Sequence, residues 1–83
     1  MPAKKPLQRK FRIYRRGDGR FVTCNEHPGD NPLGVDNTLY LALGSAIREA
    51  NMAAREGARV VIEVQQADGK FKRQQIIGPF QRS

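Results

Sequence analysis

The sequence lacks the features that mark membrane-spanning, secreted and disulfide-bonded proteins. One cysteine, Cys24, stands among 83 residues, so no internal disulfide can form. No apolar run approaches the roughly 18 residues that a membrane-spanning helix needs, and residues 1–10 lack the apolar middle region of a secretory signal. These absences favour a single small cytoplasmic domain with no membrane association.

Residues that could carry catalysis or hold a metal are equally scarce. A structural zinc site needs four close ligands, normally cysteine and histidine, and the chain has one of each. The segment Gly17-Asp18-Gly19 has neither the third glycine nor the following helix of a dinucleotide-binding loop. We therefore expect no enzyme activity, metal, cofactor or small-molecule substrate. The cluster with most chemical potential is Cys24, Glu26, His27 and Asp30, which we interpret as a buried cysteine and a solvated loop.

Positive charge is concentrated in the first quarter of the chain. Residues 1–20 carry eight cations against one carboxylate, whereas residues 21–83 carry seven of each. Clustered cations gain free energy by releasing the counterions that condense on phosphates, so this asymmetry favours a polyanionic partner. The alternative interpretation is that the charge only keeps a small domain soluble.

Two Asp-Gly turns predict two β-hairpins. The first joins residues 11–16 and 20–24 through Gly17-Asp18-Gly19, and the second joins residues 59–66 and 70–77 through Asp68-Gly69. A two-residue loop in the second hairpin places Val60, Ile62, Val64, Phe71 and Ile77 on the core side, together with Arg73 and Gln75.

The register of the first hairpin has two solutions, and a one-residue slip exchanges its faces. We prefer a two-residue loop, which leaves Arg12, Tyr14, Arg16 and Phe21 on the exposed face. It groups Phe11, Ile13, Val22 and Cys24 on the core side, whereas a three-residue loop groups Phe11, Ile13, Phe21 and Thr23.

A helix is predicted over residues 39–56. Apolar residues recur there at steps of three and four, Asn37 or Thr38 can cap the start, and Gly57 follows the last turn. Leu41 and Met52 lie off the apolar stripe, so a loop covers them or they form a homodimer surface. Residues 25–37 are expected to form a long loop, functional or mobile. The apolar stripe consists of Leu39, Leu43, Ala46, Ile47, Ala50 and Ala54.

These elements predict an α+β fold of ββαββ order, in which two hairpins form an antiparallel sheet and one α-helix packs on a face. We expect a disordered basic arm over residues 1–10, one domain over residues 11–78 and a tail over residues 79–83. Residues 45–70, which read SAIREANMAAREGARVVIEVQQADGK, resemble small bacterial proteins of the family called domain of unknown function 2188. The first hairpin is similar too, so the resemblance covers residues 11–77, and it implies a fold without an activity.

The leading functional hypothesis is a non-enzymatic module that binds the nucleic-acid backbone without sequence specificity. Arginine pairs with phosphate while aromatic rings stack on exposed bases, so cations interleaved with aromatics suit this partner. The competing hypothesis is a protein-interaction or homo-oligomeric module with no nucleic-acid role, in which sheet edges or the side of Leu41 and Met52 make the contact. The candidate nucleic-acid contacts are Lys4, Lys5, Arg9, Lys10, Arg12, Tyr14, Arg15, Arg16 and Arg20.

Overall fold

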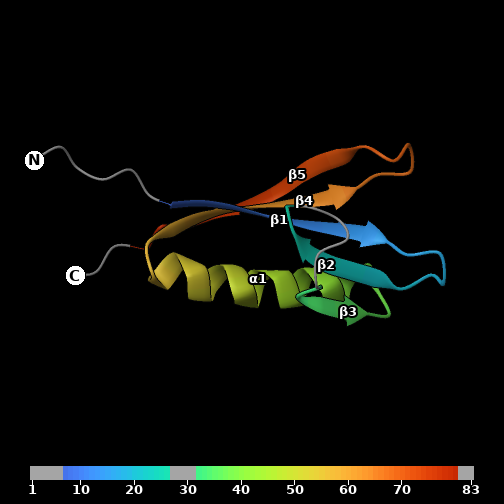
Figure 1. Cartoon of the computed structure of the whole chain (residues 1–83), viewed down its shortest axis with the longest axis horizontal. Helices are drawn as coiled ribbons and strands as arrows, with labels where there is room; N and C mark the ends of the chain where they lie inside the picture. Colours follow the sequence, from blue (N-terminus) through green and yellow to red (C-terminus); the bar gives the residue numbers. More distant parts are fainter. Residues whose placement is uncertain (1–6, 27–31, 81–83) are drawn as a thin grey trace, which may run out of the picture.

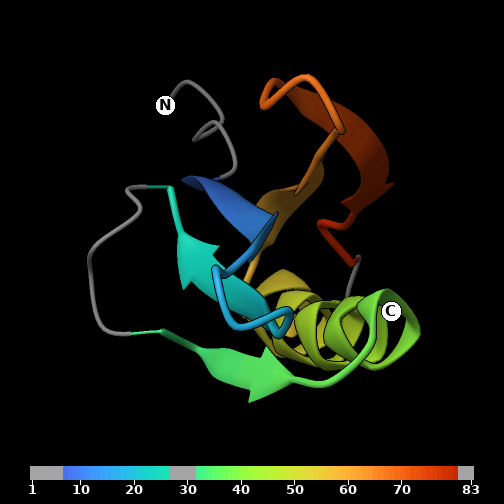
Figure 2. The same ribbon diagram turned by 90° about the vertical axis from the view of Figure 1, so that its right-hand side faces the viewer.

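Five strands form one mixed sheet with one helix across one of its faces (Figures 1 and 2). The computed structural model describes residues 7–26 and 32–80. Across the sheet the strand order is β3-β2-β1-β4-β5. The elements in chain order are β1 (Leu7–Arg15), β2 (Phe21–Asn25), β3 (Gly34–Asp36), α1 (Leu39–Arg55), β4 (Ala58–Gln65) and β5 (Phe71–Ile77).

The expected fold class is confirmed as α+β, but the sheet is not purely antiparallel. β1 and β4 are parallel neighbours at its centre, and the other three strand pairs are antiparallel. The short strand β3, inside the expected loop 25–37, adds one reversal of chain direction before α1. Because of that reversal, β4 returns in the same direction as β1.

The boundary expected for the basic arm is also wrong in part. β1 begins at Leu7, and its first four residues pair with the start of β4, from Leu7 opposite Ala58 to Lys10 opposite Val61. Residues 1–6 of the arm, 27–31 of the loop and 81–83 of the tail lie outside the described residues. The segment Leu7–Lys10 therefore belongs to the sheet.

The first hairpin uses the three-residue loop, so the preferred register is wrong and the alternative is confirmed. The Arg16 amide donates to Arg20 O at 2.7 Å and the Gly19 amide donates to Arg16 O at 2.9 Å. Gly19 takes a φ of 88°, which glycine adopts without the usual steric cost. Ile13 consequently faces Thr23 on the side of α1, and Val22 lies on the opposite side, which we call the outer face.

The second hairpin closes in the same way and then shifts register. The Gln66 amide donates to Lys70 O at 2.7 Å, so its loop also has three residues. Ile62 pairs with Gln75 whereas Glu63 pairs with Arg73, which leaves Gln74 as the extra residue of a β-bulge. Phe71 and Arg73 therefore lie on the outer face, so the core side predicted for them is wrong. The core positions predicted for Val60, Ile62, Val64 and Ile77 are confirmed.

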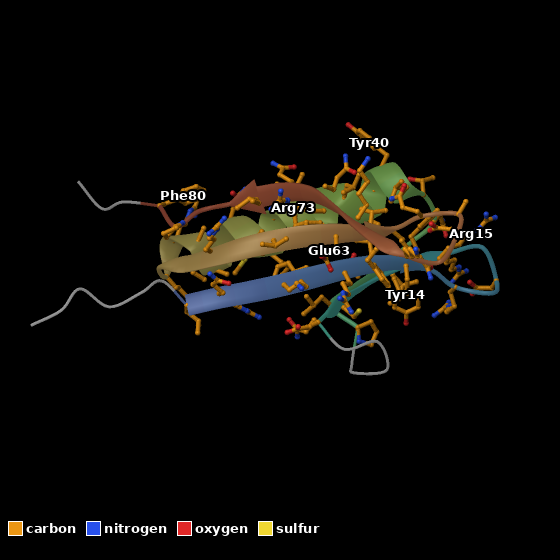
Figure 3. All side chains as sticks on the ribbon, turned by 90° about the horizontal axis from the view of Figure 1, so that it is seen from above. Tyr14, Arg15, Tyr40, Glu63, Arg73 and Phe80 are labelled. Atoms are coloured by element: carbon orange, nitrogen blue, oxygen red, sulfur yellow. The ribbon has the colours of Figure 1, made fainter. Side chains whose placement is uncertain are left out.

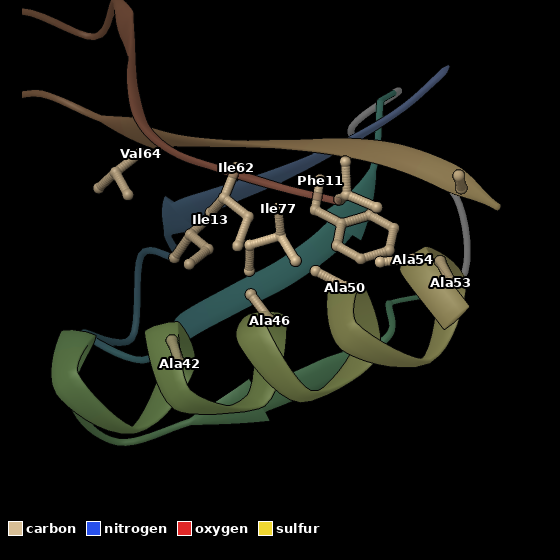
Figure 4. Packing of buried hydrophobic residues seen from close by; sticks show 12 residues of the cluster. Phe11, Ile13, Ala42, Ala46, Ala50, Ala53, Ala54, Ile62, Val64 and Ile77 are labelled. Carbon is tan, nitrogen blue, oxygen red and sulfur yellow. The ribbon is translucent and has the colours of Figure 1, made fainter. Parts of the chain in front are cut away.

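The helix follows its sequence pattern closely. Thr38 Oγ1 accepts from the Leu41 amide at 3.1 Å and caps the start, and Gly57 follows the end with a φ of 100°. Alanines on the buried side let α1 lie close to the sheet, where they contact Phe11 and Ile13 (Figure 4). This layer of small residues against branched and aromatic ones forms the core. The alanines are Ala42, Ala46, Ala50, Ala53 and Ala54.

Candidate nucleic-acid interface

The turns of the two hairpins emerge at the same end of the sheet. β1 and β4 are adjacent and parallel, so the turns that follow them emerge at the same end (Figure 1). The Arg15 amide donates to Gln65 Oε1 at 3.3 Å and joins the two hairpins just before their turns. We call this end the hairpin tips.

Five cations gather on and beside the hairpin tips, and all five are exposed. Two carboxylates, Asp18 and Asp68, lie in the same turns. The second hairpin's contribution is not evident from the sequence, because residues 21–83 are neutral as a whole. The signal for it is the pair of cations, Lys70 and Lys72, close after the second Asp-Gly turn. Arg73 pairs with Glu63 in the row of Arg12, nearer the middle of the sheet (Figure 3). The hairpin-tip cations are Arg15, Arg16 and Arg20 from the first hairpin and Lys70 and Lys72 from the second.

One of these cations is engaged within its own turn. Arg16 Nη2 lies 2.6 Å and Nε 3.1 Å from Asp18 Oδ2, and the Arg20 amide donates to Asp18 Oδ1 at 3.0 Å. The hydrogen bond from Arg16, with that from the Arg20 amide, lowers the pKa of Asp18 to about 2. The same hydrogen bond raises the pKa of Arg16. The charge of Arg16 is thus partly compensated, whereas Arg15 and Arg20 make no ion pair with any described residue.

Arg12 is fixed on the outer face by three contacts. Its Nε lies 2.9 Å from Glu63 Oε1, and its Nη1 donates to Glu26 O at 3.3 Å. Its guanidinium carbon lies 4.8 Å from the centroid of the Phe71 ring. Lys10 Nζ lies 3.9 Å from the other Glu63 oxygen. Glu63 belongs to β4, on the side next to β1 (Figure 3), and therefore compensates positive charge on this face.

Tyr14 shares the outer face with Phe71 instead of Phe21. One residue beyond the pair Ile13 and Val64, Tyr14 lies beside Gln65, which pairs with Phe71 on the next strand. Phe21 packs against the core under the sheet, so its predicted exposure beside Tyr14 is wrong. The three-residue loop causes this exchange.

Arg9 lies away from the hairpin tips. It is half-buried on the α1 side of the sheet, 5.2 Å from the Phe11 ring centroid, and donates to Asn25 Oδ1 at 3.4 Å. Lys4 and Lys5 lie outside the described residues. Of the nine candidate contacts, the structure therefore brings together Arg15, Arg16 and Arg20 at the hairpin tips, and Lys10, Arg12 and Tyr14 on the outer face.

The two residues predicted as an interface do not form one patch. Leu41 and Met52 are 50% and 60% exposed, but they are separated by about 16 Å along α1 at 1.5 Å per residue. Leu41 lines a hollow of about 490 Å³ with Tyr40, whereas Met52 lines another of about 290 Å³ with Thr23. A loop covers neither of them completely.

Cys24 is buried on the outer face, where its thiol lies 3.5 Å from Arg12 O. His27 and Asp30 fall outside the described residues. Within residues 7–26 and 32–80, no three histidine, cysteine, aspartate or glutamate side chains are grouped so that they could hold a metal ion. The helix described here, α1, is too short and too polar to span a bilayer.

Comparison with protein-family models, with curated proteins and with solved structures finds no match for this chain. The resemblance to domain of unknown function 2188 therefore stays a prediction.

Proposed function

We propose that this protein is a non-enzymatic module that binds the nucleic-acid backbone without sequence specificity, through the hairpin tips. The observation that carries the proposal is the parallel pairing of β1 with β4, which puts five cations from two distant segments at one end of the sheet. Phosphates spaced along a nucleic acid meet such a cluster with several contacts at once, and each contact releases condensed counterions.

The positions of the tip cations and of α1 favour contact with the phosphate backbone over recognition of the base sequence. The tip cations stand on two turns and on the strand ends beside them, and α1 lies flat against the sheet (Figure 2). No helix among the described residues projects from the surface so that it could enter the major groove. That groove is where each base pair presents a distinct pattern of hydrogen-bond donors and acceptors. Contacts to phosphate position a protein but carry no sequence information directly.

The test compares two double variants with the same loss of net charge. Arg15→Gln with Arg20→Gln removes two hairpin-tip cations, and Arg48→Gln with Arg55→Gln removes two exposed cations from α1. Each exposed ion contact contributes up to about 1 kcal/mol, so the tip variant should bind duplex DNA and RNA roughly tenfold more weakly than the wild type. The helix variant should bind almost as well as the wild type. Equal losses in the two variants would show that only net charge matters.

A second candidate function rests on the exposed apolar surface of α1. Tyr40 is 84% exposed and borders the same hollow as Leu41, Leu43 and Ile47. Exposed apolar patches often mark protein interfaces, so we propose this surface as the site of a homodimer or of another protein contact. Sedimentation at two protein concentrations tests the homodimer, and a persistent monomer that behaves identically as Leu41→Lys would rule it out.

A further inference from the structure

The outer face of the sheet carries two aromatic rings where a solvent-facing sheet surface is expected to be polar. Tyr14 on β1 and Phe71 on β5 lie on either side of Gln65 on β4, in one row across three strands. All three side chains are half-buried, so each ring still has surface open to solvent. This row stands next to the hairpin tips (Figure 3).

The next row along the strands provides a planar cation that is already oriented. Arg12 is held by Glu63 at 2.9 Å, and its guanidinium lies 4.8 Å from the Phe71 ring centroid. The guanidinium covers one face of the Phe71 ring, and its own free side offers a flat cationic surface on which a base can stack. Because Glu63 compensates the charge of Arg12, this row contributes less to phosphate binding than the tips do.

No described helix or strand lies over the outer face, because α1 packs on the other side (Figure 2). In a duplex the bases are stacked inside and cannot reach aromatic rings on a sheet. In a single strand the bases are free to do so while the backbone follows nearby cations.

We propose that the outer face is a stacking platform for unpaired bases, so that the ligand is single-stranded nucleic acid with its phosphates at the hairpin tips and its bases on Tyr14 and Phe71. This inference rests on the proposed function and names its substrate class. Every base has a π face, so such a platform binds without sequence specificity.

The composition of the chain allows a direct test. It has two tyrosines, Tyr14 and Tyr40, and no tryptophan, so Tyr40→Leu leaves Tyr14 as the one tyrosine reporter. Titration of this variant with a single-stranded oligonucleotide of about ten thymidines should quench the tyrosine fluorescence saturably, because stacking on a base quenches the ring. A duplex of the same length should leave the emission unchanged. The matched control is Tyr14→Leu, which retains Tyr40 on α1 and should show no quenching.

Affinity measurements on the same proteins complete the test. Stacking on one ring contributes at least about 1 kcal/mol, so Tyr14→Leu and Phe71→Leu should each weaken single-strand binding by roughly fivefold or more. Their duplex affinity and the slope of affinity against salt should not change, since neither residue is charged. Tyr40→Leu should bind as the wild type does.

The failures of the two proposals are distinguishable. If single strands bind but neither the fluorescence of Tyr14 nor the affinity of Tyr14→Leu responds, the stacking platform is wrong and backbone binding stands. Quenching by a duplex as strong as by a single strand would also overturn the platform. If neither nucleic acid binds at low salt, the proposed function itself fails.

Discussion

Arg16 and Asp18 form an ion pair within the first turn, and this pair makes one hairpin-tip cation less available than its neighbours. The carboxylate accepts from the Arg16 side chain and from the Arg20 amide, and these bonds lower its pKa from 3.8 to about 2. Because the pKa is lower in the folded state than in the unfolded state, the stability that Asp18 contributes is present above about pH 4. It is lost as the pH falls through about 2.

A carbon NMR titration of the Asp18 carboxyl group tests this directly. The midpoint should lie near pH 2 in the wild type and should rise toward 3.8 in Arg16→Gln, because the Arg16 hydrogen bond is the largest cause of the shift. The rise should be partial, since the Arg20 amide remains. Arg15→Gln is the matched control and should leave the midpoint in place. A wild-type midpoint close to 3.8 would contradict the ion pair.

Gly78 packs tightly against the end of α1. A Cβ built there would lie 2.5 Å from Ala54 Cβ and 2.7 Å from Ala58 O, and its φ is 77°. Overpacking and an unfavourable φ add up, so Gly78→Ala should lower the free energy of unfolding by about 2 kcal/mol or more in urea denaturation. Gly17→Ala is the control, since nothing lies within 4 Å of its Cβ. Equal stability of the two variants would be inconsistent with this packing.

At the scale of elements, the sequence predicted the helix and both hairpins but not how they join. The helix pattern repeats over several turns and has capping residues at both ends, so 39–56 agrees with Leu39–Arg55 to within one residue. Gly17-Asp18-Gly19 fits a loop of two or of three residues, and local sequence does not separate the two. β3 has three residues, too few for an alternating pattern, and without it the parallel pairing of β1 and β4 could not be foreseen.

The central position of β1 gives a prediction about truncation. Deleting residues 1–10 removes Leu7–Lys10, and with them the pairing of four residues to β4. This deletion should lower the free energy of unfolding relative to deletion of residues 1–6, by about 2 kcal/mol or more, because each lost backbone hydrogen bond contributes roughly 1 kcal/mol. Urea denaturation of both truncated proteins measures the difference. Identical stability would mean that Leu7–Lys10 form the arm expected from sequence and not a strand.

At the scale of the whole molecule, the fold redistributes a charge that the sequence concentrates at one end. The cations of residues 7–20 separate into the hairpin tips, the outer face and the α1 side, where Arg9 lies. The fold then adds Lys70 and Lys72 to the tips and Arg73 to the row of Arg12 on the outer face. The excess of positive charge is visible in the sequence. The cations of the second hairpin that join it are not, because their position depends on the parallel pairing of two segments about fifty residues apart.

The salt dependence of duplex DNA binding shows whether the hairpin tips contact phosphates, since a duplex probes charge without base stacking. About five phosphate contacts predict a slope of log affinity against log salt near −4.5 for the wild type. Neutralising Arg15 and Arg20 together should make the slope less negative by about 2. Neutralising Arg48 and Arg55 on α1 should leave it unchanged. Failure of the wild type to bind in dilute buffer would contradict binding to the nucleic-acid backbone. A slope that changes equally in both variants would contradict the hairpin tips as the place of contact.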